Sequence, residues 1–140
     1  MRQGVLGNLE EWGRVLEQLG ELTRSGDIER HQDELLALLQ CSDNWRLREA
    51  ALETVPAVQH PGEPLVREVC SIMLNEGLYF QARVLAAEAL DVALDRLAER
   101  SETEVMKLRR DIRDHMHALL SSQAVPVLHQ AARRILPKVE

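Results

Sequence analysis

The chain has 140 residues, which is enough for one domain that buries its own core without disulfides or a structural metal ion. Only 3% of the residues are aromatic while Leu, Ala and Val recur throughout, so the composition disfavours sandwiches and barrels and predicts an all-α fold. The formal net charge of −6 disfavours nucleic acid and anionic lipid as partners of the molecule as a whole.

The sequence carries no signal for membranes or for disulfides. No apolar run reaches membrane-spanning length, and the N-terminal region lacks the long apolar core of a signal peptide. We therefore expect a cytoplasmic protein that does not bind membranes. Cys41 and Cys70 lack CxxC spacing, and Cys70 falls at an apolar position of a predicted helix, so we expect a buried free thiol there.

The first predicted element is a helix over residues 8–24. Its apolar residues follow one another at spacings of three and four: Leu9, Trp12, Leu16 and Leu19. Gly13 and Gly20 lie on one side of this helix, and a glycine inside a helix costs about 1 kcal/mol relative to alanine, which indicates close approach of another helix. Two interpretations remain: the helix caps the rest of the fold, or it mediates homo-oligomerisation or partner docking.

After this helix, one amphipathic pattern occurs three times. WRLREAALETVPAV at 45–58, FQARVLAAEALDVAL at 80–94 and the segment 128–139 each carry an apolar stripe with the 3.6-residue period of a helix. Superposing them aligns three small residues: Ala51, Ala86 and Ala132. The spacing is uneven, so the pattern predicts a degenerate repeat with an insertion.

A partner helix is predicted before each of these three helices, near 33–40, 63–74 and 102–120. Gly26 is placed to close the first helix and Asp27 to cap the next, and Ser101 with Glu104 forms a capping box. We expect a single domain, 1–140, made of a cap at 8–24, a first repeat at 27–59, a second at 62–98 and a third at 101–139.

The segments LLALLQCSDNWRLREAALETV and ARVLAAEAL resemble HEAT repeats, in which an apolar helix, a short turn often carrying Asp, and a V-R-x-x-A-A-x-A-L helix follow one another. The resemblance covers most of residues 31–139. It implies a right-handed α-solenoid of stacked antiparallel hairpins with about seven helices. It also implies a polar ladder between neighbouring repeats, with the members Asp43, Arg48 and Arg83. Leu78 and His129 depart from the pattern, because a second Asp and a third Arg are expected there.

The solvent-facing residues of the repeated helices form the first candidate site. We call this set the acidic ridge, and its members are Arg46, Glu49, Glu53, Gln81, Glu88, Asp91, Asp95, Gln130 and Arg134. Its middle is acidic, which favours a basic or helical protein segment over a phosphate backbone. A merely solvated helix face would carry similar charges. We expect the chain to be a non-catalytic scaffold or adaptor that presents this ridge to a protein partner.

A basic stripe on the predicted helix 102–120 supports an alternative function. Its members are Arg109, Arg110 and Arg113. Such a stripe can contact phosphates. Because DNA-alkylation-repair proteins with HEAT-like helices exist, the alternative is a nucleic-acid-associated helical-repeat protein related to them. Asp111 and Asp114 interrupt the stripe, and ion pairs within the helix and with the preceding helix would explain the same charges.

The sequence assigns no catalytic residue, metal ligand or cofactor. Asp111 and His115 have helical i,i+4 spacing, but no second cluster of Cys or His completes a metal site. No glycine-rich elbow or phosphate-binding loop occurs. HEAT-like repeats are also found in bilin lyases, so a lyase accessory protein is a further alternative, carried by the fold alone.

Overall fold

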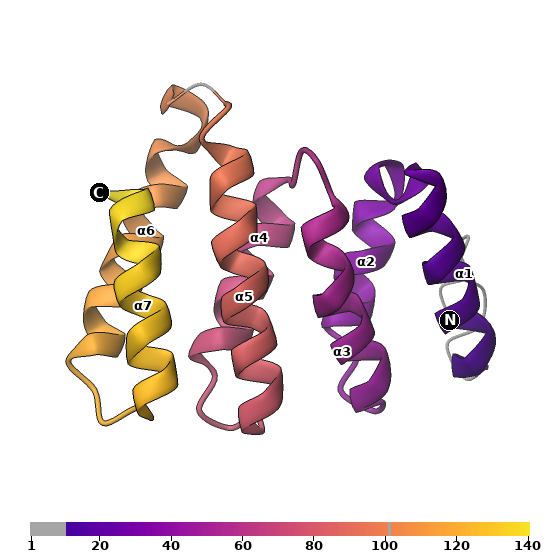
Figure 1. Cartoon of the computed structure of the whole chain (residues 1–140), viewed down its shortest axis with the longest axis horizontal. Coiled ribbons are helices and arrows are strands. Elements are labelled where there is room, and N and C mark those ends of the chain that lie inside the picture. The colour runs from indigo at the N-terminus through magenta and orange to yellow at the C-terminus, as the bar shows by residue number, and fades with distance from the viewer. Residues whose placement is uncertain (1–10, 101) are drawn as a thin grey trace.

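A computed structural model of the chain describes residues 11–100 and 102–140 (Figure 1). These residues form seven α-helices and no β-strand, which confirms the predicted all-α class. The helices are α1 (Trp12–Ser25), α2 (Gln32–Leu39), α3 (Trp45–Thr54), α4 (Glu63–Leu74), α5 (Phe80–Leu97), α6 (Glu102–Leu120) and α7 (Pro126–Val139). Two 3₁₀ segments, η1 (Asp27–His31) and η2 (Val55–Ala57), precede α2 and follow α3. None of the helices described is both long enough and apolar enough to span a membrane.

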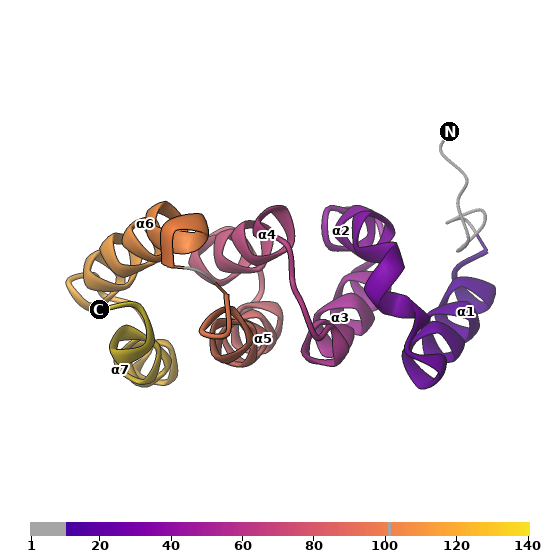
Figure 2. The same cartoon turned by 90° about the horizontal axis from the view of Figure 1, so that it is seen from above.

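The helices stand in two rows (Figure 2). In one row α2 contacts α4, and α4 contacts α6, while in the other row α1, α3, α5 and α7 contact one another in that order. Across the rows, α2 packs on α3, α4 on α5, and α6 on α7. Consecutive helices run in opposite directions, so the chain forms three helical hairpins side by side, with α1 at one end (Figure 1).

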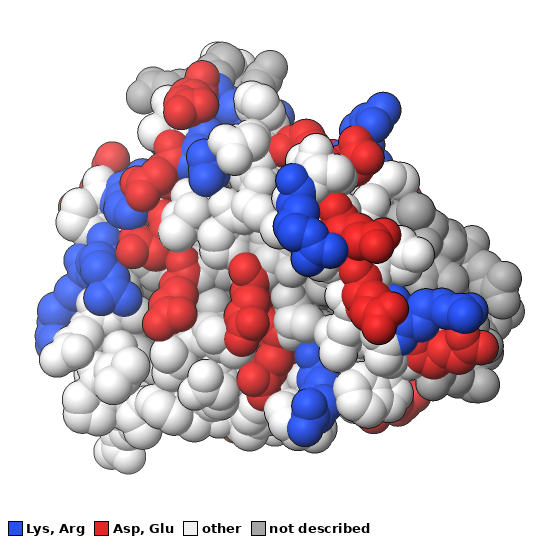
Figure 3. Space-filling model, turned by 45° about the vertical axis from the view of Figure 1, so that its right-hand side comes forward, with Lys and Arg blue, Asp and Glu red and all other residues white. Residues whose placement is uncertain are grey.

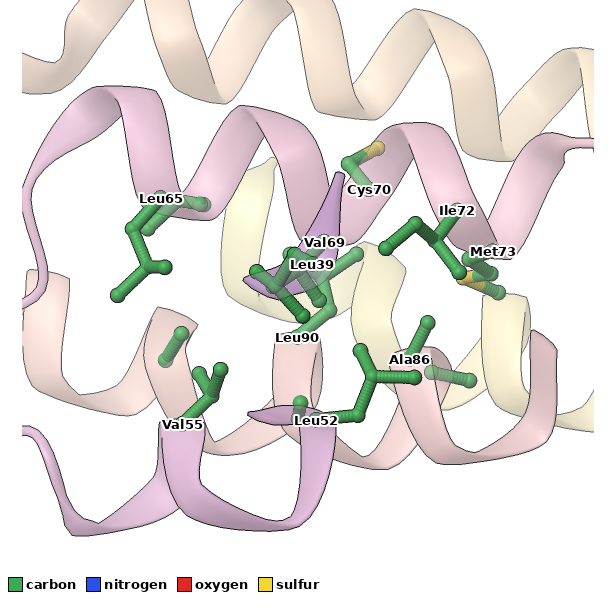
Figure 4. Packing of buried hydrophobic residues seen from close by; sticks show 14 of the residues in the cluster. Leu39, Leu52, Val55, Leu65, Val69, Cys70, Ile72, Met73, Ala86 and Leu90 are labelled. Atoms are coloured by element: carbon green, nitrogen blue, oxygen red, sulfur yellow. The ribbon is translucent and has the colours of Figure 1, made fainter. Parts of the chain in front are cut away.

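The hydrophobic core is one continuous cluster between the two rows (Figure 4). Leu90 of α5 is fully buried, and Leu52 of α3 and Val69 of α4 belong to the same cluster. Burying an aliphatic side chain of this size contributes about 1.5–3 kcal/mol. Ala86 and Ala89 of α5 are also buried, and their small side chains allow neighbouring helices to approach α5 closely.

The helix boundaries follow from local chemistry. Gly26 adopts a left-handed conformation, with φ +83°, and ends α1 as predicted, because glycine reaches this conformation without steric cost. Asp27 begins η1 instead of capping an α-helix directly. Asn44 caps α3 by accepting hydrogen bonds from the first turn of that helix. The predicted capping box of Ser101 and Glu104 rests on side chains outside those described.

A polar side chain at the same place in α3, α5 and α7 closes each hairpin. It contacts a carbonyl oxygen at or near the end of the preceding helix, at 3.4 Å for Arg48 to Leu39, 2.8 Å for Arg83 to Met73 and 3.1 Å for His129 to Leu119. The last carbonyls of a helix have no partner within the helix, and these contacts help to satisfy them. The Leu119 carbonyl also accepts hydrogen bonds from the Ser122 backbone N–H at 3.1 Å and from the Ser122 hydroxyl at 2.6 Å.

Asp43, Arg48 and Arg83 do not form the side-chain ladder that the HEAT resemblance implied. Asp43 is exposed and forms no hydrogen bond or ion pair with any residue described, so it does not join Arg48 or Arg83 in a ladder. The two arginines bind backbone within their own hairpins instead of side chains between repeats. His129 makes the same contact, although it departs from the sequence pattern.

The N-terminal helix α1 contacts η1 and α3. Leu9 and the start of the predicted helix lie outside the described residues. A Cβ added at Gly13 would meet nothing within 4 Å, and one added at Gly20 would meet only the flexible end of Arg24, 3.2 Å away. The close helix approach predicted from these glycines is thus not made by any described part of the chain.

Candidate protein interface

The acidic ridge lies on three helices of the same row. Its nine side chains are all exposed or half-buried, since they point away from the core between the rows. Figure 3 views this row obliquely and shows Asp and Glu side chains over this face, with Lys and Arg side chains between and beside them. By helix, the members are Arg46, Glu49 and Glu53 on α3, Gln81, Glu88, Asp91 and Asp95 on α5, and Gln130 and Arg134 on α7.

Two acids of the ridge are neutralised by α7. The Nζ atom of Lys138 lies 2.6 Å from a carboxylate oxygen of Asp91 and 2.9 Å from one of Asp95, and Arg134 lies 3.4 Å from Asp91. Partial burial by itself lowers the pKa of Lys138, but its hydrogen bonds with the two aspartates outweigh this effect and raise that pKa. Asp91 and Asp95 therefore join α5 to α7, and they offer a partner little free charge.

A third acid of the ridge, Glu49, joins α3 to the start of α5. The Tyr79 hydroxyl donates a 2.9 Å hydrogen bond to its carboxylate. Partial burial and the negatively charged Glu49 beside it raise the pKa of Tyr79 to about 12. Glu53 and Glu88 differ, since both are exposed and form no ion pair or hydrogen bond with the residues described. They are the ridge acids that remain open to a partner.

The structure also shows a feature that the sequence interpretation did not assign to the interface. All four aromatic residues of the chain are exposed at the N-terminal ends of α1, α3 and α5, along the lower edge in Figure 1. We call this set the aromatic edge, with the exposed fractions 41% for Trp12, 54% for Trp45, 39% for Tyr79 and 48% for Phe80. Helical phase did not signal it, because Leu52 and Ala87 lie seven residues after Trp45 and Phe80, on the same side of their helices, and both are buried.

One cation is already stacked on the aromatic edge. The Arg46 guanidinium lies 5.6 Å from the ring centre of Trp12 and 5.1 Å from that of Trp45. Both distances fall within the range of cation–π attraction. Arg46, predicted as a member of the acidic ridge, therefore links α1 to α3 through two indole rings.

The predicted basic stripe lines a hollow of about 310 Å³ where α6 meets the end of α7. Its lining consists of Met106, Arg109, Arg110, Arg113 and Val139. Among the described residues, the ion pairs predicted within the helix are not found at Arg110 or Arg113. Asp111 pairs with Arg67 of α4 at 3.0 Å, and Arg110 and Arg113 form no ion pair with the described residues.

A second groove, of about 370 Å³, lies between α4 and α6 and includes Cys70, Asp111 and His115 in its lining. Cys70 is a free thiol and only 4% exposed, and burial raises its pKa to about 12, so it stays protonated at neutral pH and is a poor nucleophile. No three His, Cys, Asp or Glu side chains in the described part of the chain are grouped to hold a metal ion.

Comparison with known proteins gives no relative for this chain. No family model matches it, and no curated protein or solved structure is significantly similar to it.

Proposed function

We propose that the chain is a non-catalytic protein-binding scaffold, built as a HEAT-like α-solenoid, whose α3–α5 side binds a basic or helical partner segment. Hairpins stacked side by side in two rows are the arrangement that helical-repeat proteins use, and such repeats commonly bind partners along one row of helices. Of the acidic ridge, the proposal uses only Glu53 and Glu88.

One observation carries this proposal. Glu53 and Glu88 lie exposed on consecutive helices of one row and form no ion pair with the described residues, while the neighbouring Asp91 is neutralised by α7. The packed helices fix where these two residues lie on the surface, and their exposed carboxylates leave negative charge available to a cationic segment. Electrostatic complementarity of this kind sets partner choice and the association rate.

The proposal is tested by reversing the two open charges. Wild-type protein and a Glu53→Lys/Glu88→Lys variant are used for affinity capture from nuclease-treated host lysate. We expect a defined protein to bind the wild type, to dissociate with added salt and to be lost with the variant. The matched control is Glu17→Lys/Glu21→Lys, which makes the same charge change at exposed positions of α1. Capture that is indifferent to both salt and the Glu53/Glu88 reversal contradicts the proposal.

A second candidate function rests on the basic hollow. Arg110 and Arg113 are unpaired among the described residues and lie within one helical turn, where like charges repel unless an anion neutralises them. This arrangement favours nucleic-acid binding through α6. We expect nucleic acid to bind with an affinity that falls steeply with salt, because neutralised phosphates release counterions. Loss of this binding in Arg110→Glu/Arg113→Glu, but not in Glu53→Lys/Glu88→Lys, would move the function to α6.

A further inference from the structure

The aromatic edge adjoins the α3 and α5 helices that carry Glu53 and Glu88, which are exposed and unpaired among the described residues. The contacts of its rings with Arg46 and Glu49 leave each aromatic side chain exposed. A chain with four aromatic residues would ordinarily bury most of them, because aromatic side chains supply large apolar contact areas. Here all four remain at least 39% exposed. Exposed aromatic side chains gathered on one edge are typical of binding surfaces, where Trp, Tyr and Arg supply most of the energy.

The charges around this edge favour a cationic occupant. Asp43 and Glu76 lie in the turns before α3 and α5, and both are exposed and unpaired with respect to the residues described. The N-terminal ends of these helices carry partial positive charge, which a full carboxylate charge in the preceding turn offsets. Two exposed cations of the edge already have partners: Arg46 is held over Trp12 and Trp45, and Arg14 in the first turn of α1 pairs with Glu11 at 3.2 Å.

The stacking of Arg46 shows what chemistry the edge accepts. A guanidinium is planar and weakly hydrated, so it stacks on an aromatic face more readily than the compact, strongly hydrated ammonium of lysine. Both indole rings keep a large exposed area in addition to this contact. The edge therefore offers further aromatic surface to the guanidinium of another chain.

We infer that the aromatic edge anchors the partner by stacking its arginine side chains on Trp12, Trp45, Tyr79 and Phe80, while Glu53 and Glu88 hold the rest of the basic segment. This inference rests on the proposed function and names the chemistry of the partner: a basic peptide segment rich in arginine. An apolar segment, or a second copy of this chain, is the competing occupant.

The tryptophans themselves report on the site, because Trp12 and Trp45 are the only two in the chain. Hexa-arginine, hexa-lysine and hexa-glutamate peptides are titrated against the full chain while tryptophan fluorescence is recorded. We expect a saturable change with hexa-arginine, weaker binding of hexa-lysine and none of hexa-glutamate. Single-tryptophan variants, Trp12→Phe and Trp45→Phe, then show which ring reports the contact.

Truncation of the edge tests the energetic role of the rings. Trp45→Ala is expected to weaken hexa-arginine binding roughly fivefold, the loss that corresponds to one exposed cation–π contact. Val127→Ala is the matched control, because Val127 is 46% exposed at the start of α7 and has no aromatic ring. Circular dichroism verifies that both variants keep their helix content, and anisotropy of labelled hexa-arginine gives the affinity.

The outcomes separate this inference from the proposed function. Hexa-arginine binding that survives Trp12→Ala and Trp45→Ala but is lost with Glu53→Lys/Glu88→Lys overturns the inference and leaves the ridge proposal standing. Binding that needs the tryptophans but tolerates the charge reversal supports the stacking of arginine on the aromatic edge and contradicts the role given to Glu53 and Glu88. Absence of saturable binding, or self-association of the wild type that Trp45→Ala abolishes, overturns the inference.

Discussion

Single residues show how one structural need is met by different side chains. Arg48, Arg83 and His129 each contact a carbonyl oxygen at or near the end of the helix that precedes them in the same hairpin. The common requirement is a donor for a backbone acceptor that has no partner inside its own helix. A sequence motif that demands arginine at this place misses the histidine, since either residue can supply the donor.

Tyr79 is the only tyrosine in the chain, so the ultraviolet absorbance of tyrosinate follows this group alone. We expect it to titrate near pH 12, because partial burial and the Glu49 carboxylate raise its pKa from 10.0. Glu49→Gln should move the pKa part of the way back, since the effect of burial remains. A wild-type titration near pH 10 would contradict the contact with Glu49.

The same shift makes a small contribution to stability that depends on pH. The folded state raises the pKa of Tyr79 above its unfolded value, so this contribution is fully present below pH 10 and is lost as the pH rises toward 12. Tyr79→Phe should remove this part of the pH dependence. Urea unfolding of the two proteins at several alkaline pH values measures the difference.

Cys70 should be nearly inert to thiol reagents while the protein is folded. Its pKa is raised to about 12 by burial, and the thiolate is the reactive form. Mass spectrometry after maleimide treatment at neutral pH is expected to find modification first at the half-buried Cys41. In urea both cysteines should react at similar rates. Rapid native modification of Cys70 would show that the core around α4 opens easily.

At the scale of elements, α1 lacks the close contact with another described helix that its glycines predicted. Gly20 lies inside this helix, and the only atoms near an added Cβ are at the flexible end of Arg24. Gly20→Ala should therefore stabilise the folded chain by about 0.5–1 kcal/mol, through helix propensity and lower unfolded-state entropy. Urea unfolding followed by circular dichroism measures this change.

The same substitution tests the predicted self-association through residues 8–24. If a second copy packs closely against α1, a methyl group at position 20 will obstruct that contact. Sedimentation of wild type and Gly20→Ala over a range of concentrations distinguishes the two cases. A dimer that is weakened by Gly20→Ala would favour the oligomer interface over simple capping.

At the scale of the whole molecule, α5 joins the hairpins to one another. It packs on α3, α4 and α7, and it carries both Leu90 of the core and the Asp91 paired with Lys138 of α7. On the other flank of α5, Arg96 donates hydrogen bonds to Gln59 and to the backbone of η2. A single continuous core and contacts on both sides predict that the hairpins unfold together.

Leu90→Ala tests this cooperativity. Loss of a fully buried leucine should lower the free energy of unfolding by about 2–5 kcal/mol, and the transition should remain a single step. Met106→Ala is the control, because Met106 is 52% exposed and its truncation should change stability by no more than about 0.5 kcal/mol. Two separate transitions in the Leu90→Ala variant would show that the hairpins unfold independently.

The fold class and the order of the helices could be predicted because helical periodicity is a local property. The apolar stripes around Ala51, Ala86 and Ala132 recur every three or four residues, and all three alanines are buried. These properties depend on neighbours within one helix, which the sequence displays directly.

The state of the candidate site was decided only by the tertiary structure. Lys138 neutralises Asp91 from a helix far along the chain. The sequence could therefore not show that Asp91 is ion-paired while Glu53 and Glu88 have no ion-pair partner among the described residues. The aromatic edge also depends on the turns, which bring the N-terminal ends of α1, α3 and α5 to one side of the molecule (Figure 1). Periodicity determines which side of a helix is buried, whereas packing determines which charges meet across helices.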